Sequence, residues 1–172
     1  MDISVIKPEF VNDLNGIKIG SEQAPKKMIE FMNLRCPFCK QWFEESHDLL
    51  TKAVAEGKVQ RIIKLLDKDK ESLQRGNVMH EYISDDPEKA LQQIEQVYIS
   101  QDNWKELSLE QVADYAEKKL RLEQQPNQSL QQEIRNEADQ ANIKFVPTVL
   151  VDNYILDESV TEDQLKEYLA LK

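Results

Sequence analysis

The stretch KMIEFMNLRCPFCKQWFEESHDLL, residues 27–50, decides the fold of this chain, because its hydrophobic pattern changes once along its length. Residues 27–34 are apolar on both faces except at Glu30 and Asn33, which is typical of a central strand. From Pro37 onward the apolar positions recur every three or four residues, as in a helix with one buried face. The stretch therefore predicts a buried strand that leads directly into an amphipathic helix.

The predicted helix and the segment after it complete a strand–helix–strand unit. The buried stripe of the helix consists of Cys39, Phe43, Ser46, Leu50 and Ala53. Gly57 is placed to end the helix, and residues 59–66 (VQRIIKLL) indicate a second buried strand. Two strands joined by a helix in this way are parallel, and the connection is almost always right-handed.

The remainder of the chain divides into a helical block and a second strand region. Residues 67–143 carry helical periods only. Residues 145–151 have strand character, and residues 154–156 are expected to pair back on them as a hairpin before a last helix. Residues 16–20 form a short alternating run that suits an edge strand. The order βαβ, helices, ββα predicts an α/β fold with an all-helical insertion.

Composition limits the kinds of partner. The chain has 172 residues, of which 40% are hydrophobic, enough for one domain that carries an inserted subdomain. It has no run of about 18 uncharged apolar residues, so no membrane span is expected. The formal charge of -10 repels phosphate backbones and anionic lipid, which disfavours nucleic-acid and membrane partners. The first residues lack signal-peptide features, so we expect a cytoplasmic location, or an extracytoplasmic one if a leader was removed.

Cys36 and Cys39 are the two cysteines of the chain, and only two residues separate them. A structural disulfide usually closes a longer loop, so this pair is predicted to be reactive. Pro37 suits the first helical position, which puts Cys36 at the N-cap, where free N–H groups and the helix dipole favour a thiolate. Arg35 and Lys40 flank the pair and are expected to act in the same direction. We predict Cys36 as the nucleophile and Cys39, on the buried stripe, as the shielded resolving thiol.

Two other interpretations of the pair are weaker. A structural zinc site needs four ligands, and His47 and His80 lie too far apart to form a ligand pair on one helix. We interpret both histidines as facing solvent, and we expect no metal. Two inert core cysteines are disfavoured because Cys36 lies outside the buried stripe.

Four segments carry a family resemblance. They are GSEQAP at 20–25, Glu30-Phe31, CPFC at 36–39 and FVPT at 145–148. With a helical block between the two halves, they resemble a DsbA-like member of the thioredoxin superfamily, over essentially the whole chain after about Ile17. The resemblance implies a thioredoxin-like domain made of residues 1–66 and 144–172, with a helical insertion at residues 67–143.

The same resemblance implies roles for single residues. Cys36 would exchange disulfides with the substrate, and Cys39 would resolve the mixed disulfide. Pro147 would be a cis-proline beside the cysteines, and Val146 would offer backbone hydrogen bonds to a bound peptide. The simpler alternative is that Val146 and Pro147 only begin a strand at the sheet edge, since proline cannot donate to a ladder.

Glu30 and the centre of the motif give two further expectations. Glu30 lies where DsbA-like proteins carry a buried acid, which could exchange a proton with Cys39. Alternatively, Glu30 could form a buried ion pair with Lys64 on the neighbouring strand, and both interpretations stay open. Pro37 and Phe38 stand where strongly oxidising relatives have Pro-His. Because phenylalanine cannot stabilise a thiolate as histidine would, we expect a less oxidising pair.

We therefore predict a thiol–disulfide oxidoreductase that acts on protein or small-molecule disulfides without a cofactor. Its partners would be protein thiols or disulfides and a thiol redox donor or acceptor. In a reducing cytosol, reductase or isomerase activity fits the sequence as well as disulfide formation does. The alternative is a non-enzymatic adaptor of the same fold, whose cysteines sense redox state. Glutathione-transferase relatives are disfavoured because they usually have serine at the start of the helix.

Overall fold

In the computed structural model, which describes residues 2–172, the core is a five-stranded sheet with the strand order β1-β3-β2-β4-β5. The strands are β1 (Ile17–Ile19), β2 (Lys26–Met32), β3 (Val59–Leu65), β4 (Thr148–Val151) and β5 (Tyr154–Leu156). β2 and β3 are parallel, whereas the other neighbouring pairs are antiparallel. The predicted edge strand, parallel unit and hairpin are therefore confirmed.

The other regular elements of the described chain are helices. They are α1 (Pro37–Ala55), α2 (Gln74–His80), α3 (Pro87–Ile99), α4 (Gln101–Trp104), α5 (Leu109–Lys118), α6 (Gln128–Gln140) and α7 (Glu162–Tyr168), with short 3-10 turns at Ile3–Val5, Pro8–Phe10 and Glu71–Leu73. The elements between β3 and β4 are all helical, so the predicted insertion is confirmed. Its division from the rest at residues 67 and 143 stays a prediction. Within residues 2–172, none of the helices combines the length and the apolar character needed to cross a bilayer.

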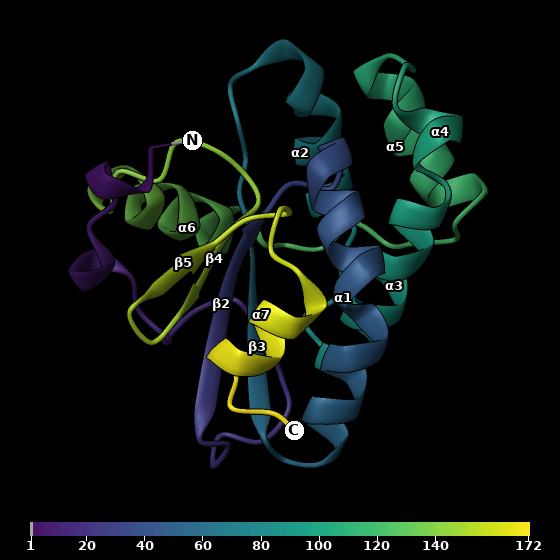
Figure 1. Ribbon diagram of the computed structural model, residues 1–172. Coiled ribbons are helices and arrows are strands. Elements are labelled where there is room, and N and C mark those ends of the chain that lie inside the picture. Colours follow the sequence, from purple (N-terminus) through teal and green to yellow (C-terminus); the bar gives the residue numbers. More distant parts are fainter. Residues whose placement is uncertain (1) are drawn as a thin grey trace.

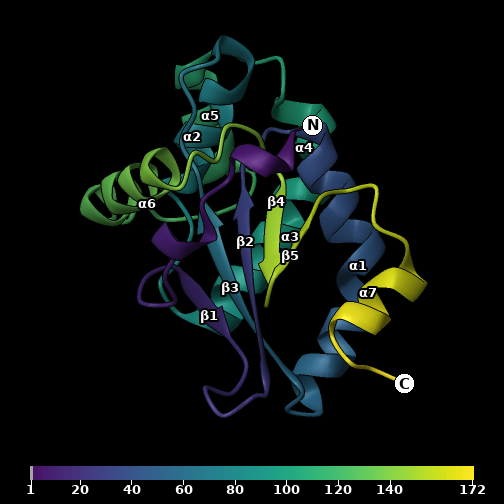
Figure 2. The same cartoon turned by 60° about the vertical axis from the view of Figure 1, so that its left-hand side comes forward.

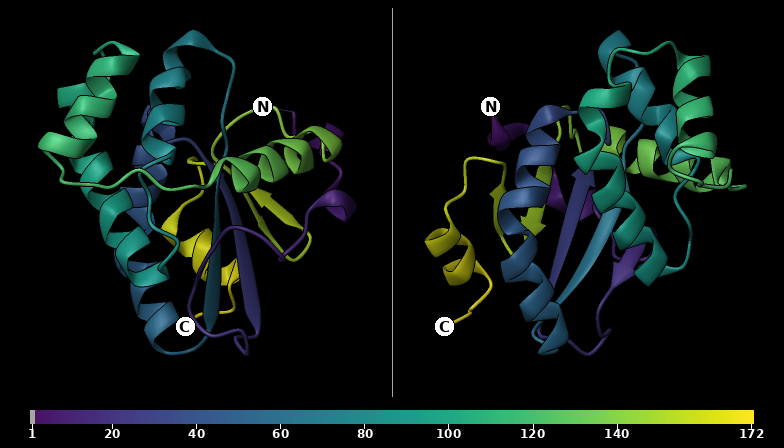
Figure 3. Two further views of the ribbon diagram at one scale, coloured as in Figure 1. Left: turned by 180° about the vertical axis from the view of Figure 1, so that it is seen from behind. Right: turned by 90° about the vertical axis from the view of Figure 1, so that its right-hand side faces the viewer.

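The helices cover both faces of the sheet. α1 and α3 lie side by side over one face, and α6 lies over the other (Figure 3). Phe43 of α1 stacks on Tyr98 of α3 with 5.3 Å between ring centroids, which joins these two helices. α7 lies beside α1 (Figure 2). Because β3 is covered on both sides, every one of its residues is buried, as expected for a continuous run of strand residues in a covered sheet.

Local signals set the ends of α1. Cys36 is its N-cap residue, with extended backbone, and Pro37 occupies the first helical position. After the last turn, Gly57 has a φ of +73°, a left-handed conformation that favours glycine and ends the helix. One predicted boundary was wrong: the strand expected at residues 145–151 begins only at Thr148, which pairs with Phe31 of β2.

Three helices of the insertion lie at the end of the sheet where α1 begins. α2, α4 and α5 gather beyond the carboxyl end of β2 (Figures 1 and 2). The turn between β2 and α1 consists of residues 33–36 and ends on Cys36. This turn therefore lies between the sheet and the inserted helices.

Candidate active site

Cys36 and Cys39 lie together at the start of α1, and both thiols are free. Their exposed fractions are 6% for Cys36 and 0% for Cys39, so the first is the more accessible of two buried side chains. The Sγ of Cys36 donates to the carbonyl oxygen of Val146 at 3.6 Å. The backbone N–H of Asn33 donates to the Sγ of Cys39 at 3.4 Å. The pair thus lies between the turn after β2 and the segment before β4.

The two thiols differ in acidity. A hydrogen bond from the Cys39 thiol lowers the pKa of Cys36 to about 7; burial opposes this, and the backbone N–H groups of Cys39 and Phe38 support it. Burial raises the pKa of Cys39 well above its ordinary value, and the neighbouring Cys36 adds to the effect. A thiolate therefore forms first at Cys36. This is the direction expected of a nucleophile at Cys36 and a resolving thiol at Cys39.

The flanking cations have other partners. Arg35 donates to the carbonyl oxygen of Lys105 at 3.1 Å and pairs with Glu106 at 3.3 Å. Lys40 pairs with Glu44, one turn further along α1, at 3.7 Å. The main stabilisation of the thiolate comes instead from the second thiol and two backbone N–H groups, because these lie in direct contact with the sulfur.

Val146 and Pro147 face the cysteine pair from the segment before β4. Their peptide bond is cis, and the carbonyl group of Val146 is the one that contacts Cys36. The hydroxyl of Thr148 donates to the carbonyl oxygen of Phe145 at 2.7 Å, which closes this short segment. The structure thus brings Val146 and Pro147 to the cysteines from a position more than a hundred residues away.

Pro37 and Phe38 form the exposed rim of the site. Phe38 is 54% exposed although the two cysteines of the motif are buried. A large apolar side chain that stays in solvent beside a buried sulfur is available to contact a polypeptide.

Glu30 is fully buried, and its partner is Arg61 rather than Lys64. Arg61 donates to both carboxylate oxygens at 2.8 Å, and the indole N–H of Trp42 in α1 donates at 2.8 Å. In the parallel register Glu30 stands opposite Ile63, so Arg61 shares its face of the sheet and Lys64 points to the other. The predicted ion pair between Glu30 and Lys64 is therefore wrong.

Lys64 belongs to a separate cluster on the α6 face. Its Nζ lies 2.7 Å from both carboxylate oxygens of Glu137 in α6 and donates to the carbonyl oxygen of Asn12 at 2.8 Å. The structure shows the Glu30 carboxylate engaged with Arg61 and Trp42. Proton exchange between Glu30 and Cys39 stays a prediction.

The insertion holds the backbone of the active-site turn. The hydroxyl of Tyr98 in α3 donates to the carbonyl oxygen of Asn33 at 3.2 Å. The side-chain amide of Gln101 in α4 donates to the carbonyl oxygens of Leu34 at 2.9 Å and Cys36 at 3.4 Å. These bonds give side-chain donors to buried carbonyl groups of the turn. The carbonyl groups of Asn33 and Cys36 also accept from the backbone N–H groups of Cys36 and Lys40.

His80 of α2 completes this clamp from a buried position. The backbone N–H of Leu34 donates to its Nε2 at 3.1 Å, and its Nδ1 lies 2.7 Å from a carboxylate oxygen of Asp67. Because Leu34 is a donor, Nε2 must accept and Nδ1 must carry the proton. The interpretation of His80 as solvent-facing is therefore wrong, because the ring is buried and both of its nitrogens have partners. These partners come from distant parts of the chain. His47, in contrast, is partly exposed and lies 3.6 Å from Glu95.

Gly76 lets α2 approach the same turn. A Cβ atom at this position would lie 1.9 Å from Oδ1 of Asn33 and 2.8 Å from the backbone nitrogen of Arg35. Only glycine fits so close to another segment. Sequence reasoning missed Gly76, Asn33 and Gln101 as site residues, and one signal could have marked the first: an isolated glycine inside a helical pattern.

Within residues 2–172, no three His, Cys, Asp or Glu side chains lie close enough together to hold a metal ion.

A parallel strand–helix–strand unit, a cysteine pair at the start of its helix and an antiparallel hairpin in the same sheet are the elements of a thioredoxin-like fold. The thioredoxin family model matches residues 12–170, so the chain belongs to the thioredoxin family. The resemblance found in the sequence is thereby confirmed. With its Cys36/Cys39 pair the protein is a thiol–disulfide oxidoreductase, a class that exchanges electrons with thiol or disulfide substrates and with a redox partner.

Solved structures agree with the family. A conserved protein of unknown function from Enterococcus faecalis V583 has 54% sequence identity and a TM-score of 0.97, over 99% of this chain and 98% of the other. The catalytic domain of Proteus mirabilis ScsC has 22% identity and a TM-score of 0.68, over 95% and 94%. Oxidised BdbD from Bacillus subtilis has 15% identity and a TM-score of 0.65, over 96% and 94%. The last two likenesses show the shared fold. Among curated proteins, none matches this chain.

Proposed function

We propose that this protein is an enzyme that reduces or isomerises disulfides in protein substrates, with Cys36 as the attacking sulfur. The observation that carries the proposal is the split in acidity, with a pKa of about 7 at Cys36 and a pKa well above the ordinary value at Cys39. The attacking cysteine has a pKa of about 7 in thioredoxin and about 3.5 in DsbA. The acidity of Cys36 therefore favours a reducing pair over a strongly oxidising one.

In the first step the thiolate of Cys36 attacks one sulfur of a substrate disulfide. A bond forms between Cys36 and that sulfur, the substrate S–S bond breaks, and the second substrate sulfur leaves as a thiolate. At neutral pH about half of Cys36 is ionised at a pKa of about 7. The nucleophile therefore needs no separate base.

In the second step Cys39 resolves the mixed disulfide. The charge of Cys36 and its hydrogen bond help to keep Cys39 protonated in the resting dithiol. Both effects end once the sulfur of Cys36 is bonded to the substrate, so Cys39 becomes easier to ionise. It then attacks Cys36 and releases the second substrate thiol, while its own proton passes to the departing sulfur. The substrate gains two electrons, and an external dithiol must reduce the Cys36–Cys39 disulfide again.

We assign substrate binding to Val146, Pro147 and Phe38. The carbonyl group of Val146 lies beside the attacking sulfur, and it precedes the paired residues of β4. Its backbone is therefore available to an extended substrate segment. The exposed ring of Phe38, two residues after Cys36, offers apolar contact. This combination suits an unfolded or extended polypeptide, recognised by its backbone and by apolar side chains.

A reducing pair suits a reducing compartment. We therefore propose a cytoplasmic location, with a dithiol protein or low-molecular-weight thiol as the electron donor. In such a compartment the resting state is the dithiol, which is also the state in which Cys36 can attack.

The proposal is tested by turnover of a protein disulfide with dithiothreitol as the electron donor. We expect the wild-type protein to accelerate the reduction, Cys36→Ser to abolish it, and Cys39→Ser to accumulate mixed disulfides with the substrate. Reversible oxidation without turnover would instead favour the redox-sensing adaptor.

The equilibrium reduction potential against glutathione tests the direction of electron flow. We expect a value between about -270 mV, as in thioredoxin, and about -120 mV, as in DsbA, and nearer to the first. A potential near the second limit would make the protein an oxidant and would overturn the reductase proposal, while leaving the roles of Cys36 and Cys39 intact.

A further inference from the structure

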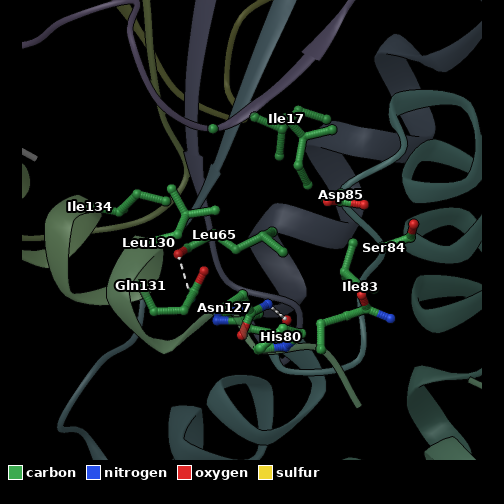
Figure 4. A pocket seen from close by; sticks show the side chains of 14 residues that line it. Ile17, Leu65, His80, Ile83, Ser84, Asp85, Asn127, Leu130, Gln131 and Ile134 are labelled. Carbon is green, nitrogen blue, oxygen red and sulfur yellow. Dashed lines mark hydrogen bonds between the residues drawn. The ribbon is translucent and has the colours of Figure 1, made fainter. Parts of the chain in front are cut away.

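A cavity of about 260 Å³ lies behind the active-site turn, between the sheet edge and α6 (Figure 4). Its walls are mostly apolar. They are formed by Ile17, Ile63, Leu65, Ile83, Leu130 and Ile134. An apolar cavity of about 150 Å³ is large enough for benzene, so this one has room for a small bicyclic ring.

One buried polar atom of the lining has no partner. Within residues 2–172, Oδ1 of Asn127 is buried without a hydrogen bond. The orientation of this amide is fixed, because its Nδ2 donates to the carbonyl oxygen of His80 at 2.9 Å (Figure 4). Leaving a buried acceptor unpaired is unfavourable, so we expect an occupant of the cavity to donate a hydrogen bond to Oδ1.

The lining also disfavours a charged occupant. Asp85 is the one Asp, Glu, Lys or Arg among the described lining residues, and it is exposed. A charged group inside the cavity would lose its hydration without an opposite charge to replace it. The side-chain NH2 group of Gln131 already donates to the carbonyl oxygen of Leu65 and to a carboxylate oxygen of Asp67. The occupant that fits this lining therefore has an apolar body and one hydrogen-bond donor.

The cavity is joined to the catalytic turn through one residue. His80 lines the cavity and accepts the hydrogen bond from the backbone N–H of Leu34, two residues before Cys36. An occupant in contact with the imidazole ring would restrict its movement. Opening of the turn at Leu34 would then require the ring to move against a filled cavity.

We propose that this cavity binds a small, uncharged, apolar molecule with one N–H or O–H donor, and that its occupancy restrains the active-site turn through His80. The site is separate from Val146, Pro147 and Phe38, to which substrate binding is assigned. It does not depend on the direction of electron flow.

Indole and benzothiophene are the probes for binding, because they share a bicyclic shape and only indole has an N–H donor. Calorimetric titration of the full-length reduced protein should show one saturable site that binds indole about tenfold more tightly than benzothiophene. Benzothiophene is the more apolar molecule, so a site without donor recognition would bind it at least as tightly. That order, or no saturable binding of either probe, would overturn the proposal.

Two variants locate the site. Leu130→Trp should fill the cavity and abolish binding of both probes, whereas Leu91→Trp, at a partly buried leucine of α3 outside the lining, should leave binding unchanged. Asn127→Ala should weaken indole about tenfold and leave benzothiophene unaffected. It keeps the proposal testable if Leu130→Trp does not fold. Indole binding that survives both Leu130→Trp and Asn127→Ala would place the site elsewhere.

Hydrogen exchange of the Leu34 amide tests the link to the turn. If opening requires an empty cavity, indole at ten times its Kd should slow this exchange about elevenfold. The amide of Leu169, at the end of α7, should be unaffected. An unchanged exchange rate at Leu34 under saturating indole would overturn the restraint through His80.

Discussion

The active-site turn, residues 33–36, is held from two sides by different kinds of contact. On the sheet side the contacts reach sulfur: Val146 accepts from Cys36, and the N–H of Asn33 donates to Cys39. On the insertion side, side chains such as His80 and Gln101 contact the backbone of the turn, and other groups of the insertion bind the side chains of Asn33 and Arg35. The first residues of α1 therefore decide which thiol ionises, since the Cys39 thiol and the N–H groups of Phe38 and Cys39 lower the pKa of Cys36. The insertion helps to decide where the turn lies.

This difference teaches how an inserted block can serve a redox site without touching its reacting atoms. Hydrogen bonds to N–H and C=O groups of the turn fix its position but place no new charge beside the sulfurs. We expect changes on the insertion side to alter the reaction rate and leave the thiol pKa in place. Changes beneath the pair, in the sheet, are expected to act mainly on stability, because buried charges lie there.

The largest effect is expected on the sheet side, from Arg61→Met. This change leaves the buried carboxylate of Glu30 without its cation, which costs about 3–5 kcal/mol of unfolding free energy. Urea denaturation measures the loss. The double variant with Glu30→Gln should recover part of it, because a neutral amide needs no counter-charge and can still accept from Trp42. A loss below about 1 kcal/mol in Arg61→Met would mean that the pair is not a main support of this side.

Gly76→Ala is the matching steric test on the insertion side. The added Cβ would overlap the side chain of Asn33, so we expect a loss of about 3 kcal/mol, near the upper end for overpacking. Displacement of the turn should also slow alkylation of Cys36.

The control is Gly57→Ala. Its Cβ would meet open space, but its φ of +73° makes any other residue cost about 1 kcal/mol. We expect this variant to keep wild-type reactivity at Cys36. Equal losses in the two variants would show that the close approach of α2 carries no special constraint.

The parts of the fold that the sequence predicted are those fixed by local pattern. The apolar run of β2 and β3, the helical stripe of α1 and its cap at Cys36 each follow from neighbours within a few residues. The role of the segment around Val146 came only from the family resemblance, because no local rule brings residues 145–148 to the cysteines.

The errors fall where partners depend on register or on distant segments. Lys64 lies on the strand next to Glu30, but a shift of one residue in strand register reverses the face, and of Arg61 and Lys64 only Arg61 shares the face of Glu30. The sequence does not show that His80 is buried, because its two partners, Asp67 and the N–H of Leu34, come together only once α2 packs on the turn. The candidate cysteines were visible in the sequence, and the clamp around them was not.

His80→Leu separates positioning from acidity. Leu34 loses the acceptor of its buried N–H, which costs about 2 kcal/mol, and exchange of its amide should accelerate. His80→Gln should restore most of the loss, because the side-chain oxygen of glutamine reaches about as far as Nε2 and can accept.

Titration of the Cys36 thiolate shows whether His80 positions the turn or also affects the acidity of Cys36. In His80→Leu the rate of disulfide reduction should fall while the pKa of Cys36 stays at about 7. His80→Gln should recover the rate. If the pKa moves together with the rate, the insertion also takes part in the chemistry, and the division between the two sides fails.

The smallest effect is the pH dependence that Cys36 itself gives to stability. In the folded reduced protein its pKa is lowered from 9.0 to about 7. Between these values the unfolded chain binds more protons, so stability rises with pH; the contribution is complete above about 9 and is lost as the pH falls through about 7. From pH 6 to pH 8 the gain is about 1 kcal/mol. Cys39, whose pKa is raised, acts in the opposite direction once the unfolded chain ionises, at still higher pH.

Urea denaturation of the reduced protein at pH 6 and pH 8, compared between wild type and Cys36→Ser, isolates this gain. Both proteins contain the same two histidines, so the titration of those histidines cancels in the difference. Wild type should gain about 1 kcal/mol more than the variant over this interval. His80→Gln should keep this gain in stability, because the hydrogen bond of His80 joins the ring to the N–H of Leu34 and not to a sulfur atom. Equal pH dependence in wild type and Cys36→Ser would mean that Cys36 does not ionise in the folded state at neutral pH, and its contacts with Cys39 and the N–H groups of α1 would then not account for a reactive thiolate.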